Sequence, residues 1–84
     1  ELSEIYPNPF NPVTNISFSL PFESEVIIEI YDMRGRLVQE LFRGNKTAGL
    51  HIISWYAENS PSGIYFIRFN AENFTHSKKV ILLK

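Results

Sequence analysis

The sequence predicts an all-β fold, an immunoglobulin-like antiparallel β-sandwich of about seven short strands. Three observations support this prediction. Apolar residues alternate with polar ones at a period of two in several segments, as they do in half-buried strands. Glycine, proline, asparagine and aspartate separate these segments at short intervals, as turns require. No useful length of chain shows helical periodicity, and 84 residues suffice for one small domain with one core.

The segment Tyr6–Pro12 carries three of the five prolines. A proline donates no backbone hydrogen bond and pushes the residue before it into an extended conformation, so this segment cannot be a central strand. We interpret it as an ordered arm or edge, which the aromatic rings of Tyr6 and Phe10 can pin to the body. A short strand is expected just before it, at Glu4–Tyr6.

The clearest strand follows at Thr14–Leu20. Its apolar residues occupy every second position and therefore one face: Ile16, Phe18 and Leu20. Pro21–Ser24 then turns the chain toward the next strand.

The segment Val26–Leu41 predicts a β-hairpin. Its first half has an apolar row at every second position: Val26, Ile28 and Ile30. At the turn, Asp32 can bond its own backbone, and Gly35 can take the positive φ that closes a short loop. Beyond the turn, the spacing of three between Val38 and Leu41 breaks the alternation and predicts a β-bulge. The segment after Phe42 reads as a polar loop, 43–49.

The segment Leu50–Tyr56 is predicted as a strand with two apolar faces. One face carries His51, Ile53 and Trp55, and the other carries Leu50, Ile52 and Tyr56. A strand covered on both sides suits a sandwich interior or a contact surface. Two further strands, Gly63–Asn70 and Thr75–Leu83, complete the expected fold.

The sequence holds no pattern typical of catalysis or of a metal or cofactor site. Asp32 is the only aspartate, and turn chemistry explains it. His51 and His76 fall on different strands with no acidic or histidine neighbour at ligand spacing, and the alignment of His51 with Trp55 favours a structural histidine. No pair of glutamates has the spacing of a general acid and base. We therefore expect a non-enzymatic domain that binds neither a metal nor a cofactor.

Composition restricts the partners. The net charge of −1 gives no basis for nucleic-acid binding, and the absence of cysteine removes disulfides and thiolate chemistry. The longest apolar run, Val80–Leu83, is too short to span a bilayer, so we expect no integral membrane protein. Because the chain starts at Glu1 without a methionine or a signal peptide, we interpret it as a piece of a longer protein.

Two features leave alternatives open. Five aromatic residues could form a sugar-binding platform or fill the core, and core is the favoured interpretation: Trp55, Tyr56, Tyr65, Phe66 and Phe69. At the end of the chain, Lys78, Lys79 and Lys84 flank an apolar run. Taken alone, these lysines are interpreted as solvated residues that protect an edge strand from aggregation.

Six segments in register resemble one known family, the type A C-terminal sorting domain of the bacterial type IX secretion system. The segments are Tyr6–Pro12, Ile16–Pro21, Ile30–Arg36, Ala48–Gly49 with His51 and Trp55, Ser62–Tyr65, and Lys78–Lys79. The likeness covers nearly the whole chain, from Tyr6 to Lys84, and extends to an immunoglobulin-like domain of flagellar hook-capping proteins. It implies a single sorting domain over residues 1–84, with a proline-rich leading segment at 1–12 and a sandwich body at 14–84.

The resemblance implies a role as an address label on a cargo protein that lies N-terminal to it. Such a cargo crosses the periplasm and then the outer membrane through a translocon, and a sortase commonly removes the label and attaches the cargo to the cell surface. The implied partners are the translocon and the sortase, and the implied location is secreted or at the cell surface. The implied recognition residues are Gly63, Tyr65, Lys78, Lys79 and Lys84, while Asp32 and Gly35 form a structural turn.

A rival function belongs to a different class. An immunoglobulin-like module can bind carbohydrate, or stabilise or space a neighbouring catalytic domain. Exposed aromatic residues in one row would favour that function.

Overall fold

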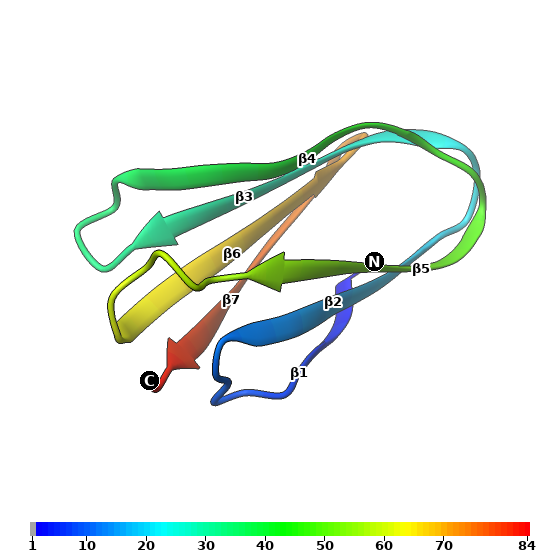
Figure 1. Ribbon diagram of the computed structural model, residues 1–84. Helices are drawn as coiled ribbons and strands as arrows, with labels where there is room; N and C mark the ends of the chain where they lie inside the picture. The colour runs from blue at the N-terminus through cyan, green and yellow to red at the C-terminus, as the bar shows by residue number, and fades with distance from the viewer. Residues whose placement is uncertain (1) are drawn as a thin grey trace.

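The computed structural model describes residues 2–84 and shows seven β-strands and no helix in that range (Figure 1). The strands are β1 (Leu2–Tyr6), β2 (Val13–Leu20), β3 (Ser24–Asp32), β4 (Leu37–Lys46), β5 (Gly49–Tyr56), β6 (Gly63–Ala71) and β7 (Phe74–Leu82). They form a three-stranded sheet in the order β1-β2-β5 and a four-stranded sheet in the order β4-β3-β6-β7. All neighbouring strands are antiparallel. The predicted all-β sandwich is confirmed.

The chain passes between the two sheets three times, from β2 to β3, from β4 to β5 and from β5 to β6. Figure 1 shows the first two connections at one end of the sandwich and the third at the opposite end. This alternation between sheets gives the immunoglobulin-like arrangement, and it places the last strand at the edge of the larger sheet.

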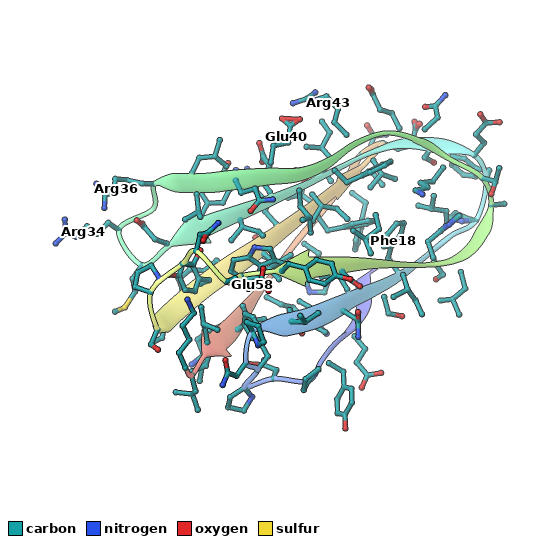
Figure 2. All side chains as sticks on the ribbon, viewed as in Figure 1. Phe18, Arg34, Arg36, Glu40, Arg43 and Glu58 are labelled. Atoms are coloured by element: carbon teal, nitrogen blue, oxygen red, sulfur yellow. The ribbon has the colours of Figure 1, made fainter. Side chains whose placement is uncertain are left out.

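The alternating rows meet between the sheets and form the core. Phe18 of β2 points into this space (Figure 2), where its ring lies 5.0 Å from that of Phe69. The fully buried side chains of the core include Ile16, Phe18, Val26, Ile28, Ile30, Trp55, Ile67, Phe69, Val80 and Leu82. Burial of these apolar side chains between the sheets is the main contribution to holding the two layers together.

The hairpin of β3 and β4 turns at the predicted place. The carboxylate of Asp32 accepts hydrogen bonds from the backbone N–H of Arg34 at 2.9 Å and of Arg36 at 3.0 Å, and Gly35 has a φ of +83°. Two bulges follow in β4, because its pairing with β3 skips Val38 and then Leu41. The bulge predicted from the spacing of these two residues is therefore confirmed, with one bulge at each of them.

The prediction of a loop over 43–49 is wrong for most of its length. β4 continues through Arg43 to Lys46, opposite Ile27 and Ser24 of β3, and β5 begins at Gly49. β4 is an edge strand whose side chains are mostly solvent-exposed, so polar residues can continue it without an apolar row.

Of the two alternatives for the strand at Leu50–Tyr56, the sandwich interior is wrong. Trp55 is buried, and His51 and Ile53 are half-buried on the inner face. The other row, Leu50, Ile52 and Tyr56, is about two-thirds exposed on the outer face of the smaller sheet. The exposed outer row excludes a place in the sandwich interior and leaves the second alternative, a contact surface.

The proline-rich arm that joins β1 to β2 is fixed by one of its two predicted anchors. Phe10 is 3% exposed and its ring lies 5.3 Å from that of Trp55, whereas Tyr6 is 68% exposed and cannot pin the arm. A further contact comes from Thr14, whose hydroxyl donates to the carbonyl of Pro7 at 2.7 Å. The arm therefore lies against the sandwich as an ordered segment.

Candidate functional site

The last strand, β7, supplies the candidate site. It pairs with β6 along its whole length and has no second strand neighbour in residues 2–84. In an antiparallel ladder, both peptide groups of one residue point to the same side, and those of the next residue point to the opposite side. The peptide groups of Ile81 contact the arm, so those of Thr75, Ser77 and Lys79 also point away from β6.

The arm covers the second half of this outer edge. The side-chain amide of Asn8 donates to the carbonyl of Lys79 at 3.0 Å and accepts from the N–H of Ile81 at 3.0 Å. The backbone of Phe10 continues the pattern, since its N–H donates to the carbonyl of Ile81 at 2.9 Å and its carbonyl accepts from the N–H of Leu83 at 3.0 Å. Asn8 and Phe10 thus occupy the place that a neighbouring strand would take.

The first half of the edge is open. Thr75, Ser77 and Lys79 are all exposed, and within residues 2–84 no partner is found for the outward N–H groups of these three residues or the carbonyls of the first two. This open edge, Thr75–Lys79, thus presents the outward peptide groups of Thr75, Ser77 and Lys79, with which a partner in an extended conformation can pair.

The neighbouring lysines of β7 face opposite sides of the sheet. Lys78 shares its face with buried Val80 and Leu82 and is half-buried, whereas Lys79 is exposed on the outer face. Lys84 lies beyond the strand, where its N–H donates to the hydroxyl of Ser62 at 2.9 Å and its ammonium group donates to the carbonyl of Glu58. The three lysines therefore have three different environments.

Gly63 and Tyr65 lie at the start of β6, opposite Leu82 and Val80 of β7. The ring of Tyr65 is buried and lies 5.4 Å from that of Trp55, and its hydroxyl donates to the carbonyl of Pro61 at 2.6 Å. The side chain of Tyr65 thus holds the start of β6 against the core and cannot itself touch a partner from outside.

The titratable groups of residues 2–84 whose pKa is shifted lie in one hairpin. The backbone N–H of Arg36, with help from that of Arg34, holds the pKa of the Asp32 carboxyl below its ordinary value of 3.8. The hydrogen bond from Arg43 lowers the pKa of the Glu40 carboxyl in the same way. Both effects belong to the hairpin of β3 and β4, and Figure 2 shows Arg34 and Arg36 extending away from the sandwich at its tip.

The two histidines contact backbone and aromatic groups. His51 lies 2.8 Å through Nε2 from the carbonyl of Thr47, and its ring stacks on Phe18. His76 packs edge-on against Phe74, and its Nδ1 is buried without a partner among the described residues. Within residues 2–84 no three histidine, aspartate or glutamate side chains gather as a metal site would require.

The aromatic residues do not form a common platform. Trp55, Tyr65 and Phe69 are buried in the core. Tyr56 is exposed on the outer face of the smaller sheet, and Phe66 is half-buried on the outer face of the larger one. The two surface rings therefore lie on opposite sides of the sandwich and cannot stack on one sugar.

Comparison with known protein families decides what kind of domain this is. The family described as the secretion system C-terminal sorting domain matches residues 4–83, which is nearly the whole chain. The chain belongs to this family. No curated protein and no solved structure is significantly similar to it.

Membership of the sorting-domain family gives the chain a role in type IX secretion, as a sorting signal attached to a cargo. A protein that carries such a tail is exported to the cell surface or secreted. Sorting domains of this kind are normally not catalytic. Among the described residues there is no helix long and apolar enough to cross a membrane.

Sequence reasoning missed the contact between the arm and β7. Asn8 and Phe10 lie more than seventy residues from their partners, with separations of 71 and 73 residues for the two bonds of Asn8. One sequence feature could have predicted this contact, the asparagine that lies among the prolines of the arm. An asparagine side chain has one acceptor and two donors, so it can imitate a strand residue where prolines leave the backbone without N–H groups.

Proposed function

We propose that this sorting domain directs a cargo protein from the periplasm across the outer membrane through the type IX translocon, and that the translocon reads the domain at β7. A sortase then removes the domain and attaches the cargo to the cell surface. The observation that carries the proposal is the position of β7 at a sheet edge, with exposed peptide groups and basic side chains, in a chain of this family.

The five recognition residues have different roles in this proposal. Lys79 is exposed on the outer face and contacts the partner directly, whereas Lys78 acts from the inner face of β7 and Lys84 from beyond its end. Gly63 and Tyr65 act indirectly, because they set the position of β6, on which β7 lies. We also propose that residues 1–84 work as one unit, since Asn8 and Phe10 of the arm are hydrogen-bonded to the last strand of the sandwich body.

The test is a secretion assay. Residues 1–84 are fused to the C-terminus of a fluorescent protein that carries a periplasmic signal peptide, in a host with and without the translocon. We expect surface or extracellular fluorescence only where the translocon is present, and its loss when Lys78–Lys84 is removed. Export of the truncated fusion at the full level would contradict the proposal.

Charge reversal separates recognition from folding. Lys79→Glu changes an exposed side chain and should leave thermal unfolding unchanged while it lowers export. Lys78→Glu changes a half-buried side chain, so its effect on export is interpretable only beside its unfolding curve. Equal export by Lys79→Glu and by the unchanged domain would exclude a direct contact at this lysine.

A carbohydrate-binding module is less well supported, because three of the five candidate aromatic residues are buried and the other two face opposite sides. A module that stabilises or spaces a neighbouring domain keeps one specific observation in its favour. The row of Leu50, Ile52 and Tyr56 is exposed and apolar, as a contact surface between domains often is. A cargo enzyme that unfolds at a lower temperature without residues 1–84 would support this second function.

A further inference from the structure

We propose that the open edge Thr75–Lys79 binds an extended segment of another protein, which adds to the larger sheet as an extra strand and carries acidic side chains on its outer face. This inference rests on the proposed function and narrows it, because it names the part of β7 that is read and the chemistry of the partner. Three observations carry it.

The first observation is the division of the edge into two halves. From the carbonyl of Lys79 to the N–H of Leu83, every outward group that the arm can reach is bonded to Asn8 or Phe10. The outward groups from Thr75 to the N–H of Lys79 face solvent instead. A strand that paired with the covered half would first have to displace the arm and the buried ring of Phe10. The open half needs no such rearrangement.

The second observation is a groove beside the open edge. It has a volume of about 420 Å³ and lies on the outer face of β3, β6 and β7. Its walls include Tyr31, Phe66, Arg68, Thr75 and Ser77. Side chains of an added strand alternate between the two faces of the sheet, so every second one would lie next to this groove.

The third observation is the sign of the charge. Strands β6 and β7 contain Arg68, Lys78 and Lys79 and no acidic residue. On the outer face, Arg68 pairs across the strands with Ser77, and Phe66 pairs with Lys79, so both cationic groups flank the open edge. Within residues 2–84 neither of these two cations forms an ion pair.

Acidic groups lie on the other side of Arg68. Glu29 of β3 is its cross-strand neighbour and accepts a hydrogen bond from Tyr31, and the acidic and basic pair of Glu40 and Arg43 lies further away on β4. The charge of the outer face thus changes from acidic near β4 to basic near β7. A partner strand beside β7 meets the basic side, and acidic side chains complement it.

The binding test uses a synthetic eight-residue peptide of alternating glutamate and valine, and a matched peptide of alternating lysine and valine. Amide hydrogen exchange of the folded domain is measured by NMR with each peptide. We expect the acidic peptide to slow exchange at Thr75 and Ser77, and the basic peptide to leave it unchanged. No protection by the acidic peptide, or protection at Leu50 and Ile52 of β5 instead, would overturn the proposal. Protection that rises with protein concentration without peptide would identify a second copy as the occupant and overturn it as well.

Two variants test the charge. Arg68→Glu should weaken binding of the acidic peptide about fivefold, since within residues 2–84 this exposed cation forms no ion pair and the change breaks only its contact with the ring of Tyr31. Arg34→Glu makes the same change in net charge at the hairpin tip, away from the sandwich (Figure 2), and should leave binding unchanged. An equal loss in both variants would show a response to net charge alone and would contradict a local site.

Export then separates this inference from the proposed function. Ser77→Pro removes one outward N–H without removing a bond to β6, and Arg68→Glu serves as a second variant if the proline prevents folding. We expect reduced export of both, beside normal export of Arg34→Glu. Normal export of folded Arg68→Glu, together with loss of export on removal of Lys78–Lys84, would refute the open edge as the recognition surface and leave the proposed function in place. Normal export after that removal would refute the proposed function itself.

Discussion

Two edge strands of the sandwich, β5 and β7, differ in how they are protected. β5 lies at the edge of the smaller sheet with a regular register and no Lys, Arg, Asp or Glu, and its outer row is apolar and exposed. The N–H of Ala57 bonds to Pro12 beside β2, so the peptide groups of Leu50, Ile52, Ser54 and Tyr56 point outward. β7 has lysines along it and an arm over half of its edge.

The difference teaches that this small domain does not protect its edges uniformly. β4 is disrupted by two bulges and has charged side chains, as most natural edge strands do. β7 combines an uncovered half with basic groups, which suits selective binding. β5 has neither bulges nor charges, so it is the edge most prone to unselective pairing.

The largest change in stability is expected at Phe10, which anchors the arm to the core. Phe10→Ala removes a buried ring from beside Trp55 and should lower the free energy of unfolding by about 3–5 kcal/mol. Chemical denaturation followed by tryptophan fluorescence measures this change. Tyr6→Ala is the control, because its ring is mostly exposed, and it should shift the same quantity by less than about 0.5 kcal/mol. Equal effects of the two variants would mean that the arm does not depend on Phe10.

A smaller effect is expected at the amide of the arm. Asn8→Ala removes two hydrogen bonds to β7 but leaves their partners near solvent, so the free energy of unfolding should fall by about 1 kcal/mol. Amide exchange at Ile81 should accelerate while exchange at the core strand β3 stays slow. Asn11→Ala changes an exposed asparagine of the same arm for which no side-chain bond is found in residues 2–84, and serves as the control. Unchanged exchange at Ile81 would show that the bond is not formed in solution.

The unprotected edge gives the third prediction. We expect the exposed apolar row of β5 to cause self-association at high protein concentration. Ile52→Lys places a charge in this row and should abolish that association, with little change in stability. Sedimentation velocity over a concentration series measures this. Leu37→Lys makes a similar change on the bulged edge of β4 and should not alter association. If Ile52→Lys and Leu37→Lys lower self-association equally, β5 is no more prone to pairing than β4.

The smallest effect is expected from pH. Because hydrogen bonds to its carboxylate lower the pKa of Asp32 in the folded state, this group stabilises the fold above its ordinary pKa of 3.8. The stabilisation is lost as the pH falls through the lowered folded-state pKa. Thermal unfolding of Asp32→Asn should therefore vary less with pH than that of the unchanged domain between about pH 5 and pH 2. Glu23→Gln, in the connection between β2 and β3, is the control, and an identical pH profile for Asp32→Asn would exclude this contribution.

Local patterns predicted much of the fold. The rows of Ile16 with Phe18 and of Val26 with Ile28 identified buried strand faces, since the alternation of side chains follows from the strand geometry alone. The turn at Asp32 and the bulged spacing of Val38 and Leu41 were likewise local. The continuation of β4 to Lys46 was not predicted, because an exposed edge strand needs no apolar row and leaves no periodic signal.

The site was predicted less completely than the fold. Sequence reasoning expected β7 at a sheet edge with lysines beside it and favoured a core position for Tyr65, which the structure confirms. It could not tell that Lys78 and Lys79 would differ in burial. Which half of the edge is open depends on Asn8 and Phe10, whose partners are at the other end of the chain. No local pattern contains that information.

The contact between the arm and Leu83 also bears on synthesis. Phe10 leaves the ribosome before β7 is made, and the last of its backbone partners follows some seventy residues later, so the arm cannot close until almost all of residues 2–84 have emerged. A chain that ended before β7 would lack the strand to which the proline-rich arm is hydrogen-bonded. The closed arm thus forms only once residues 81–83 have been made, and machinery that accepts only the closed form would reject a domain truncated before them.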